Sequence, residues 1–209
     1  MVQTLAESLA SFDEQNVMGE VDKRLGSDSN PIELVRELQE GMKLVGERFN
    51  AGTYFLSELL MSADLFTRAL AKVEPHLAGQ TTEIIGKIVL GTPKGDIHDL
   101  GKNIFRDVAK AAGFEIHDLG VDVPTAKFIA AVEDIKPDVL GFSALITTAF
   151  GTMKDVVDTL VEKNLRNGLR IIVGGGVVTD AVRKHIGADR FTLDAMEGVN
   201  ICQEFVSAN

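Results

Sequence analysis

The chain has 209 residues, of which 45% are hydrophobic and 25% charged, and a formal net charge of -10. This composition is typical of a soluble globular protein with one large or two small domains. The acidic balance argues against a nucleic-acid partner, which would require clustered Lys and Arg, and favours a partner with a basic face. Because Cys202 is the only cysteine, a disulfide framework and a thiolate metal cluster are excluded. A bound metal would need His, carboxylates or a prefabricated cofactor.

The order of the predicted elements divides the chain into two domains. Residues 1–80 have helical periodicity throughout, whereas residues 81–209 alternate apolar strands with amphipathic helices. The segment 75–82 contains Pro, Gly and two Thr residues and is expected to link the domains. Segment 1–15 has neither a basic start nor a continuous apolar stretch, and no apolar run of about 18 residues occurs. We therefore expect a cytoplasmic protein.

The first domain is predicted to be a four-helix bundle. Two weaker helices precede Gly26, and a third begins at Asn30-Pro31, since Pro fits the first helical position, and ends near Asn50. A fourth is expected from about Phe55 to Leu77. The two long helices carry apolar stripes at steps of three and four residues, which should pack together. The stripes are Leu34, Leu38, Met42, Val45 and Phe49, and Leu59, Leu60, Ala63, Phe66 and Leu70.

The second domain is predicted to be an α/β domain with a five-stranded parallel sheet, either Rossmann-like or flavodoxin-like. The predicted strands are 84–91, 115–119, 139–143, 170–173 and 190–193. The predicted helices are 100–112, 125–135, 148–163, 179–186 and 196–206. The carboxyl ends of parallel strands lie along one rim, which is where open α/β sheets bind ligands.

Unusual residues occupy three loops of this rim. Asp96 and His98 follow the first strand; residues two apart in an extended stretch share a side, so the carboxylate can orient the ring of a metal-binding His. Ser143 and Thr147 supply hydroxyl groups after the third strand. Glycines 174–176 follow the fourth strand and would let a bulky ligand contact the backbone. A lone His is more often an ordinary loop residue, but three such loops together indicate a ligand site.

The remaining candidate residues are expected to be structural. His76, His117 and His185 lack a paired acidic or histidine ligand at metal-binding spacing, so we expect them at the surface or at helix ends. Cys202 lies in the last predicted helix and is expected to be a small buried apolar residue.

The motifs of the three loops resemble the signature of cobalamin-binding domains. The matching residues are Asp96-x-His98-x-x-Gly101, Ser143-x-Leu145 and Gly174-Gly175. Segments 41–56 and 118–124 are similar to the helical cap and the cobalamin domain of methionine synthase and of methyl-transferring corrinoid proteins. The resemblance covers essentially the whole chain. It departs from the family pattern at Ser57, where Pro is common, and at Gly176-Val177, where Ala-Pro is frequent.

The resemblance implies a base-off, His-on cobalamin with His98 as the axial ligand to cobalt. Asp96 and Ser143 would form a hydrogen-bonded relay behind His98, so that proton uptake accompanies loss of the ligand. The displaced nucleotide base would enter a slot beside the sheet. The residues that the resemblance assigns to the slot are Gly101, Gly174 and Gly175. It assigns further cofactor contacts to Asp99, Leu145 and Thr147, and an apolar lid to Phe55 and Leu56, with Tyr54 beside them.

The function implied by the resemblance is that of a corrinoid methyl carrier in one-carbon metabolism. A methyl group would pass through Co(I) and methyl-Co(III) between a substrate methyltransferase and an acceptor methyltransferase that uses a folate or a thiol, with a reductive activation protein as a further partner. The sequence offers no second substrate site, so the chain is not expected to turn over alone. Partners would dock after the cap swings aside. The methyl donor, the acceptor, the lower base and the oligomeric state stay open.

Three other classes of protein are alternatives. The cobalamin subunit of a carbon-skeleton mutase would share the sheet and His98, but the methyl-type cap argues against it. A cobalamin-dependent sensor or transcription regulator would need a DNA-binding module, which the acidic balance disfavours. An FMN-binding electron carrier would need a phosphate loop rich in Ser and Thr, of which segment 91–95 is a poor version.

Overall fold

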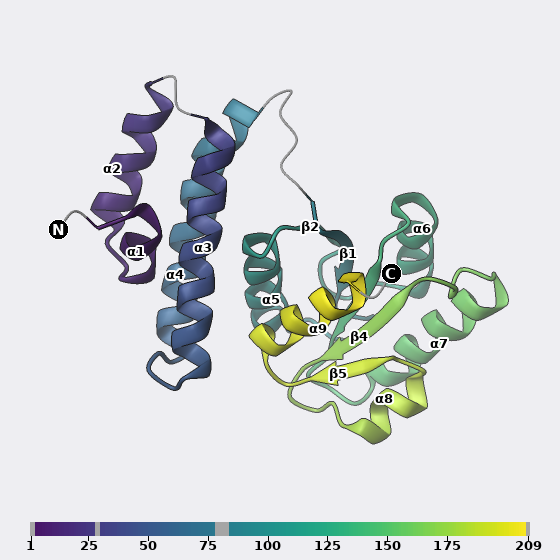
Figure 1. Ribbon diagram of the computed structural model, residues 1–209. Coiled ribbons are helices and arrows are strands. Elements are labelled where there is room, and N and C mark those ends of the chain that lie inside the picture. Colours follow the sequence, from purple (N-terminus) through teal and green to yellow (C-terminus); the bar gives the residue numbers. More distant parts are fainter. Residues whose placement is uncertain (1–2, 28–29, 78–83, 208–209) are drawn as a thin grey trace. The chain divides into compact units, whose positions relative to one another are not determined.

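The computed structural model describes residues 3–27, 30–77 and 84–207 (Figure 1). It divides into a helical unit, formed by residues 1–84 with 111–113, and a sheet unit, formed by residues 85–110 and 114–209. The predicted boundary between residues 80 and 81, and residues 78–82 of the predicted linker, lie outside the described residues.

The helical unit contains the four predicted helices. They are α1 (Leu5–Ala10), α2 (Glu14–Leu25), α3 (Pro31–Asn50) and α4 (Leu56–Val73), followed by a 3-10 turn, Glu74–Leu77. Asn30 caps α3 by accepting a hydrogen bond from the Ile32 amide, with Pro31 in the first turn as predicted. The fourth helix is shorter than predicted because Pro75 has no N–H to continue the α-helical hydrogen bonds.

The core of the helical unit lies among α1, α3 and α4. Seven residues of the predicted apolar stripes are buried in it, because residues three and four apart on a helix share one face, whereas Phe49, Leu60 and Leu70 are only half-buried. The fully buried large side chains of this unit are Leu9, Leu34, Leu38, Leu59 and Phe66.

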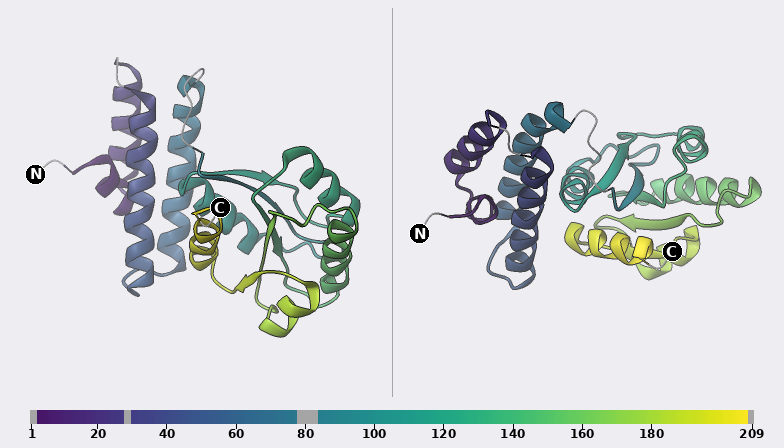
Figure 2. Two further views of the ribbon diagram at one scale, coloured as in Figure 1. Left: turned by 45° about the vertical axis from the view of Figure 1, so that its right-hand side comes forward. Right: turned by 45° about the horizontal axis from the view of Figure 1, so that its top comes forward.

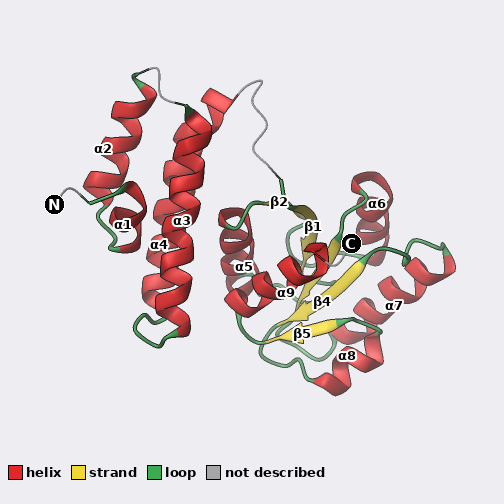
Figure 3. Cartoon of the chain, in the orientation of Figure 1, coloured by secondary structure: helices red, strands yellow, loops and turns green. Residues whose placement is uncertain are grey.

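The sheet unit contains five parallel strands in the order β2-β1-β3-β4-β5 (Figure 3). This order is that of flavodoxin-like folds. The strands are β1 (Gly86–Gly91), β2 (Phe114–Asp118), β3 (Val139–Ser143), β4 (Arg170–Gly174) and β5 (Arg190–Thr192). In this register Leu90 pairs with Asp118 on one side and with Gly141 on the other, so the loops after these strands begin at similar heights.

Helices cover both faces of the sheet, as Figure 2 shows. They are α5 (Leu100–Ala111), α6 (Thr125–Ile135), α7 (Ala149–Glu162), α8 (Asp180–Ile186) and α9 (Ala195–Ser207). Helices α6, α7 and α8 bury one face, where Phe128 and Met153 pack on Leu140 and Val173. Helices α5 and α9 cover the other face. Within this unit every predicted strand and helix is present, with ends shifted by at most two residues. Among the described residues, no helix is long and apolar enough to cross a membrane.

Candidate functional site

Asp96 and His98 form a hydrogen-bonded pair in the loop between β1 and α5. Oδ1 of Asp96 lies 2.7 Å from Nδ1 of His98 and accepts a second hydrogen bond from the His98 amide at 3.0 Å. The carboxylate therefore favours the tautomer with its proton on Nδ1, which leaves a lone pair on Nε2. The Asp96 side chain is fully buried, whereas 52% of the His98 side chain is exposed. The pair presents an oriented donor nitrogen to a ligand at the rim.

The second oxygen of Asp96 joins this loop to the loop after β3. Oδ2 accepts hydrogen bonds from the amides of Leu145 at 2.7 Å and Ile146 at 3.3 Å. Burial raises the pKa of Asp96, but the hydrogen bonds from Leu145, His98 and Ile146 outweigh it and leave the pKa below its ordinary value. Asp96 is therefore a carboxylate at neutral pH and acts as an acceptor only.

Ser143 is half-buried at the end of β3. Across the described part of the chain, no hydrogen bond joins its hydroxyl to Asp96, since the amides of Leu145 and Ile146 contact Oδ2. Its place in a relay behind His98 stays a prediction. The two amides could not be predicted because a backbone N–H has no signature in the sequence. The only signal for these donors was the general rule that a carboxylate such as Asp96 needs hydrogen-bond donors when it is buried.

The three glycines assigned to the slot differ in their surroundings. A Cβ atom on Gly101 would have no neighbour within 4 Å, so open space adjoins the first turn of α5. A Cβ atom on Gly174 would make ordinary contacts, the nearest at 3.7 Å. Gly175 has φ of +123°, and its Cβ atom would lie 1.9 Å from the carbonyl oxygen of Ala144. The fold itself therefore requires glycine at position 175, whatever it binds.

Large apolar side chains are exposed along the rim of the sheet that carries His98. They come from the loops after β1, β3 and β5, all at the carboxyl ends of the strands. The exposed fractions are 73% for Ile97, 63% for Leu100, 45% for Leu145 and 66% for Leu193. Exposed apolar side chains gathered at one rim are typical of a surface that a ligand or a partner covers.

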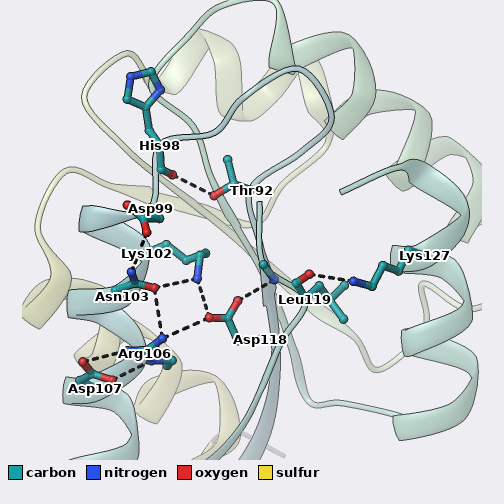
Figure 4. Close-up of polar contacts among 11 residues, drawn as sticks. Thr92, His98, Asp99, Lys102, Asn103, Arg106, Asp107, Asp118, Leu119 and Lys127 are labelled. Carbon is teal, nitrogen blue, oxygen red and sulfur yellow. Dashed lines mark hydrogen bonds and ion pairs between the residues drawn. The ribbon is translucent and has the colours of Figure 1, made fainter. Parts of the chain in front are cut away.

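An ion pair between buried Lys102 and partly exposed Asp118 fixes the start of α5, as Figure 4 shows. Lys102 is 3% exposed, and its Nζ lies 2.5 Å from Oδ2 of Asp118 and 2.9 Å from Oδ1 of Asn103. Arg106 lies 3.5 Å from the same carboxylate. Burial raises the pKa of Asp118, but Lys102, the Gly120 amide and Arg106 lower it to below its ordinary value. This pair was not predicted, although Lys102 directly follows Gly101 in the sequence.

The remaining predicted contacts in the sheet unit lie at the surface of the same rim. Asp99 is exposed and accepts a hydrogen bond from the side-chain amide of Asn103 at 3.1 Å, which places it at the first turn of α5. Thr147 is exposed in the loop before α7. Both are accessible to a ligand near His98, and their contact with a cofactor stays a prediction.

The predicted lid residues lie at the start of α4 in the helical unit. Phe55 is 70% exposed and Leu56 is 49% exposed. Tyr54 beside them is half-buried: its hydroxyl donates to the Ala10 carbonyl at 2.6 Å and accepts from Arg48 at 2.6 Å. Tyr54 thus fixes this loop to the end of α1. The lid itself stays a prediction.

Ser57, where the sequence departs from the family pattern in the cap, also supports the start of α4. Ser57 donates a hydrogen bond to Glu58 at 2.9 Å, and the same carboxylate accepts the Phe55 amide at 2.8 Å. An unpaired amide at the start of the helix is thereby satisfied. Ser57 therefore leaves the local geometry of α4 intact.

The other histidines and the cysteine do not form a second site. His117 is half-buried within β2 and not at a helix end, and its Nε2 lies 2.6 Å from Glu115, because residues two apart share one side of a strand. His76 and His185 are exposed as expected. Cys202 is buried, and burial raises the pKa of its thiol to about 12. In the described ranges, no group of three or more His, Cys, Asp or Glu could hold a metal ion.

Comparisons with known protein families match both units. Two families, each described as a B12 binding domain, match residues 86–204 and residues 1–74. The first match contains Asp96, His98, Gly101 and Ser143, which the sequence analysis assigned to the site.

Known proteins are similar over nearly the full chain. A dimethylamine corrinoid protein of Methanosarcina barkeri is 36% identical over 209 residues, covering 99% of this chain and 98% of the relative. A crystal structure of a cobalamin-binding protein from Desulfitobacterium hafniense has a TM-score of 0.75 and 38% identity, with 96% of each chain covered. A chain of the methanol:cobalamin methyltransferase complex from Methanosarcina barkeri has a TM-score of 0.87 and 28% identity, with 98% of this chain and 79% of that chain covered.

Proposed function

The chain belongs to the B12-binding domain family, and on this premise we propose that it is a corrinoid methyl carrier whose His98 is the axial ligand to cobalt. The observation that carries the proposal is the Asp96–His98 pair, which leaves Nε2 of an exposed ring free to donate. The similarity to a dimethylamine corrinoid protein over nearly the whole chain supports the methyl-carrier assignment.

The residues at the rim fit cobalamin. Cobalamin would bring most of the ligands of its cobalt, so the protein would need to supply only one nitrogen donor, and the exposed His98 ring would supply it. Ile97, Leu100 and Leu145 offer exposed apolar surface to a broad ring. The open space beside Gly101 suits the insertion of a displaced nucleotide base.

The side chains of the site would control axial ligation. Bound cobalamin would supply the cobalt that carries a methyl group from donor to acceptor. Asp96 holds the proton of His98 at Nδ1 and so keeps Nε2 available as a donor. If the ring left the metal, the same hydrogen bond to Nδ1 would keep it oriented toward the rim.

The methyl donor and acceptor would be held by separate methyltransferases. The similar chain in the methanol:cobalamin methyltransferase complex supports a complex of this kind. We propose that one methyltransferase supplies the methyl group and another delivers it to a folate or a thiol. The substrate is therefore set by these partners and not by the rim described here.

Titration of the purified protein with hydroxocobalamin tests the proposal. We expect stoichiometric binding and an absorbance spectrum in which imidazole replaces the cofactor's own base. His98→Ala should weaken binding by about a hundredfold, since loss of a group behind a ligand already costs about 10–100-fold. His185→Ala, on the exposed surface of α8, is the matched control and should bind like the wild type. Unchanged binding and an unchanged spectrum in His98→Ala would overturn the proposal.

A further inference from the structure

The loop that carries Asp96 is paired along its length with the loop between β2 and α6. The Thr92 amide donates to the Gly120 carbonyl at 3.0 Å, and the Val123 amide donates back to the Thr92 carbonyl at 3.0 Å. The Lys94 amide donates to Val123 at 2.8 Å. These bonds extend the pairing of β1 and β2 beyond the ends of both strands, so the second loop supports the first.

Asp122 has an unusual backbone conformation at the far end of this pairing. Its φ is +52°, which is uncommon for a residue other than glycine and is tolerated best by Asn and Asp. In this conformation its amide and its carboxylate point to the same part of the neighbouring loop. Strained conformations of this kind persist where the surrounding structure requires them.

The two polar groups of Asp122 hold the peptide groups on either side of the Gly95–Asp96 bond. The Asp122 amide donates to the Asp96 carbonyl at 2.9 Å, and its Oδ1 accepts the Gly95 amide at 2.7 Å. The second bond is charge-assisted and therefore among the stronger kinds of hydrogen bond. Gly95 itself has φ of +90°. A backbone that turns sharply at position 95 is thus fixed from outside, directly before the carboxylate that orients His98.

We infer that Asp122 is a positioning residue for the axial ligand, which acts through Asp96 on His98; the inference rests on the function proposed above. Thr92 supports the same loop from its other end, since its hydroxyl donates to the His98 carbonyl at 3.1 Å (Figure 4). These hydrogen bonds hold the backbone of the loop at Gly95, Asp96 and His98. Without the Asp122 carboxylate, the Gly95 amide loses its partner and the direction of the Asp96 side chain is less well defined.

Two variants separate the side chain of Asp122 from its backbone conformation. Asp122→Gly permits the positive φ but removes the carboxylate, whereas Asp122→Asn keeps an acceptor oxygen and tolerates the conformation. Asn164→Gly is the matched control, because Asn164 also has a positive φ, +59°, and lies at the end of α7, outside the rim loops. The thermal midpoint of each apo-protein checks that all three are folded.

The measurements are the affinity for hydroxocobalamin and the axial-nitrogen splitting in the electron paramagnetic resonance spectrum of cob(II)alamin bound to protein labelled with 15N in its histidines. We expect Asp122→Gly to weaken binding about tenfold and to give a mixture of spectra with and without an axial protein nitrogen. Asp122→Asn should restore both properties to within about twofold, and Asn164→Gly should match the wild type. A merely structural effect would move the thermal midpoint but not the spectrum.

Combination with His98→Ala tests whether the effect passes through His98. In that background Asp122→Gly should cause no further loss of affinity, because the ligand that it positions is absent. An additive loss, or an Asp122→Gly protein with wild-type affinity and spectrum, would overturn the inference. If the wild-type protein itself shows no axial protein nitrogen, the proposed function fails instead, and the two failures are therefore distinguishable.

Discussion

The two units of this protein present their candidate functional residues in opposite ways. In the sheet unit the central residue, Asp96, is fully buried and all its oxygens are hydrogen-bonded, so the geometry of His98 is set by the protein alone. In the helical unit Phe55 and Leu56 are largely exposed. The hydrogen bonds of Asp96 therefore identify its role from the protein alone. The role of exposed apolar residues such as Phe55 and Leu56 depends on the molecule that they contact.

The largest effect is expected for Gly175→Ala. The new methyl group would overlap the carbonyl of Ala144 and the positive φ would be strained, which together should lower the free energy of unfolding by about 4 kcal/mol. Gly174→Ala is the matched control and should cost less than about 1 kcal/mol, because its contacts are ordinary. Urea denaturation measures both. Equal effects would contradict the assignment of Gly175 to the fold.

Removal of the charge of Asp118 should have the second largest effect. Asp118→Asn leaves the ammonium of buried Lys102 without a counter-charge and should lower the free energy of unfolding by about 3 kcal/mol at neutral pH. Because the pKa of Asp118 is lowered in the folded protein, its stabilisation is complete above the ordinary pKa and is lost as the pH falls through the lowered one. The difference between wild type and variant should therefore shrink in acid.

The double variant Lys102→Met with Asp118→Leu serves as the control for this pair. Replacement of both charges by apolar groups of similar size leaves no unpaired charge and should restore most of the lost stability. If Asp118→Asn were as stable as the wild type from about pH 7 to pH 4, the pair would not be what fixes the start of α5.

Tyr54→Phe tests the anchor of the cap loop and should have a smaller effect. The variant keeps the ring that packs against Phe12 but loses the hydroxyl shared by Arg48 and the Ala10 carbonyl. We expect the free energy of unfolding to fall by about 1 kcal/mol. Urea denaturation would detect this. A loss above about 3 kcal/mol would mean that the hydroxyl supports more than this loop.

Phe55→Ala should have the smallest effect on stability, within about 0.5 kcal/mol, because the side chain is largely exposed. If Phe55 contributes to a lid, the variant should instead let oxygen oxidise bound cob(II)alamin several times faster, as followed by absorbance. Met61→Ala, which removes another exposed apolar side chain of α4, is the control. Equal rates in wild type and Phe55→Ala would remove Phe55 from the lid.

Much of the fold was predictable because it depends on patterns that the sequence displays directly. Apolar stripes at helical spacing gave α3 and α4, and the alternation of apolar runs with amphipathic segments gave the order of strands and helices. The pairing of Asp96 with His98 was predictable from their spacing alone, because residues two apart in an extended stretch share a side.

The features of the site that could not be predicted depend on contacts between segments that are far apart in the sequence. The Leu145 and Ile146 amides that hold Asp96 have no side-chain signal, and Asp122 contacts Gly95 only because two loops are paired in space. Gly175 could be recognised as unusual in the sequence, but the approach of the Ala144 carbonyl that explains it could not. A short-range pattern cannot specify such contacts.

The identity of the nitrogen on cobalt tests the account most directly. Protein labelled with 15N in its histidines is loaded with unlabelled cobalamin, reduced to cob(II)alamin, and its electron paramagnetic resonance spectrum is recorded. We predict that each cobalt line splits into a doublet, the pattern of one 15N ligand, and that the doublet disappears in His98→Ala. A triplet from the 14N of the cofactor's own base, or no splitting at all, would contradict the assignment of His98 as the axial ligand.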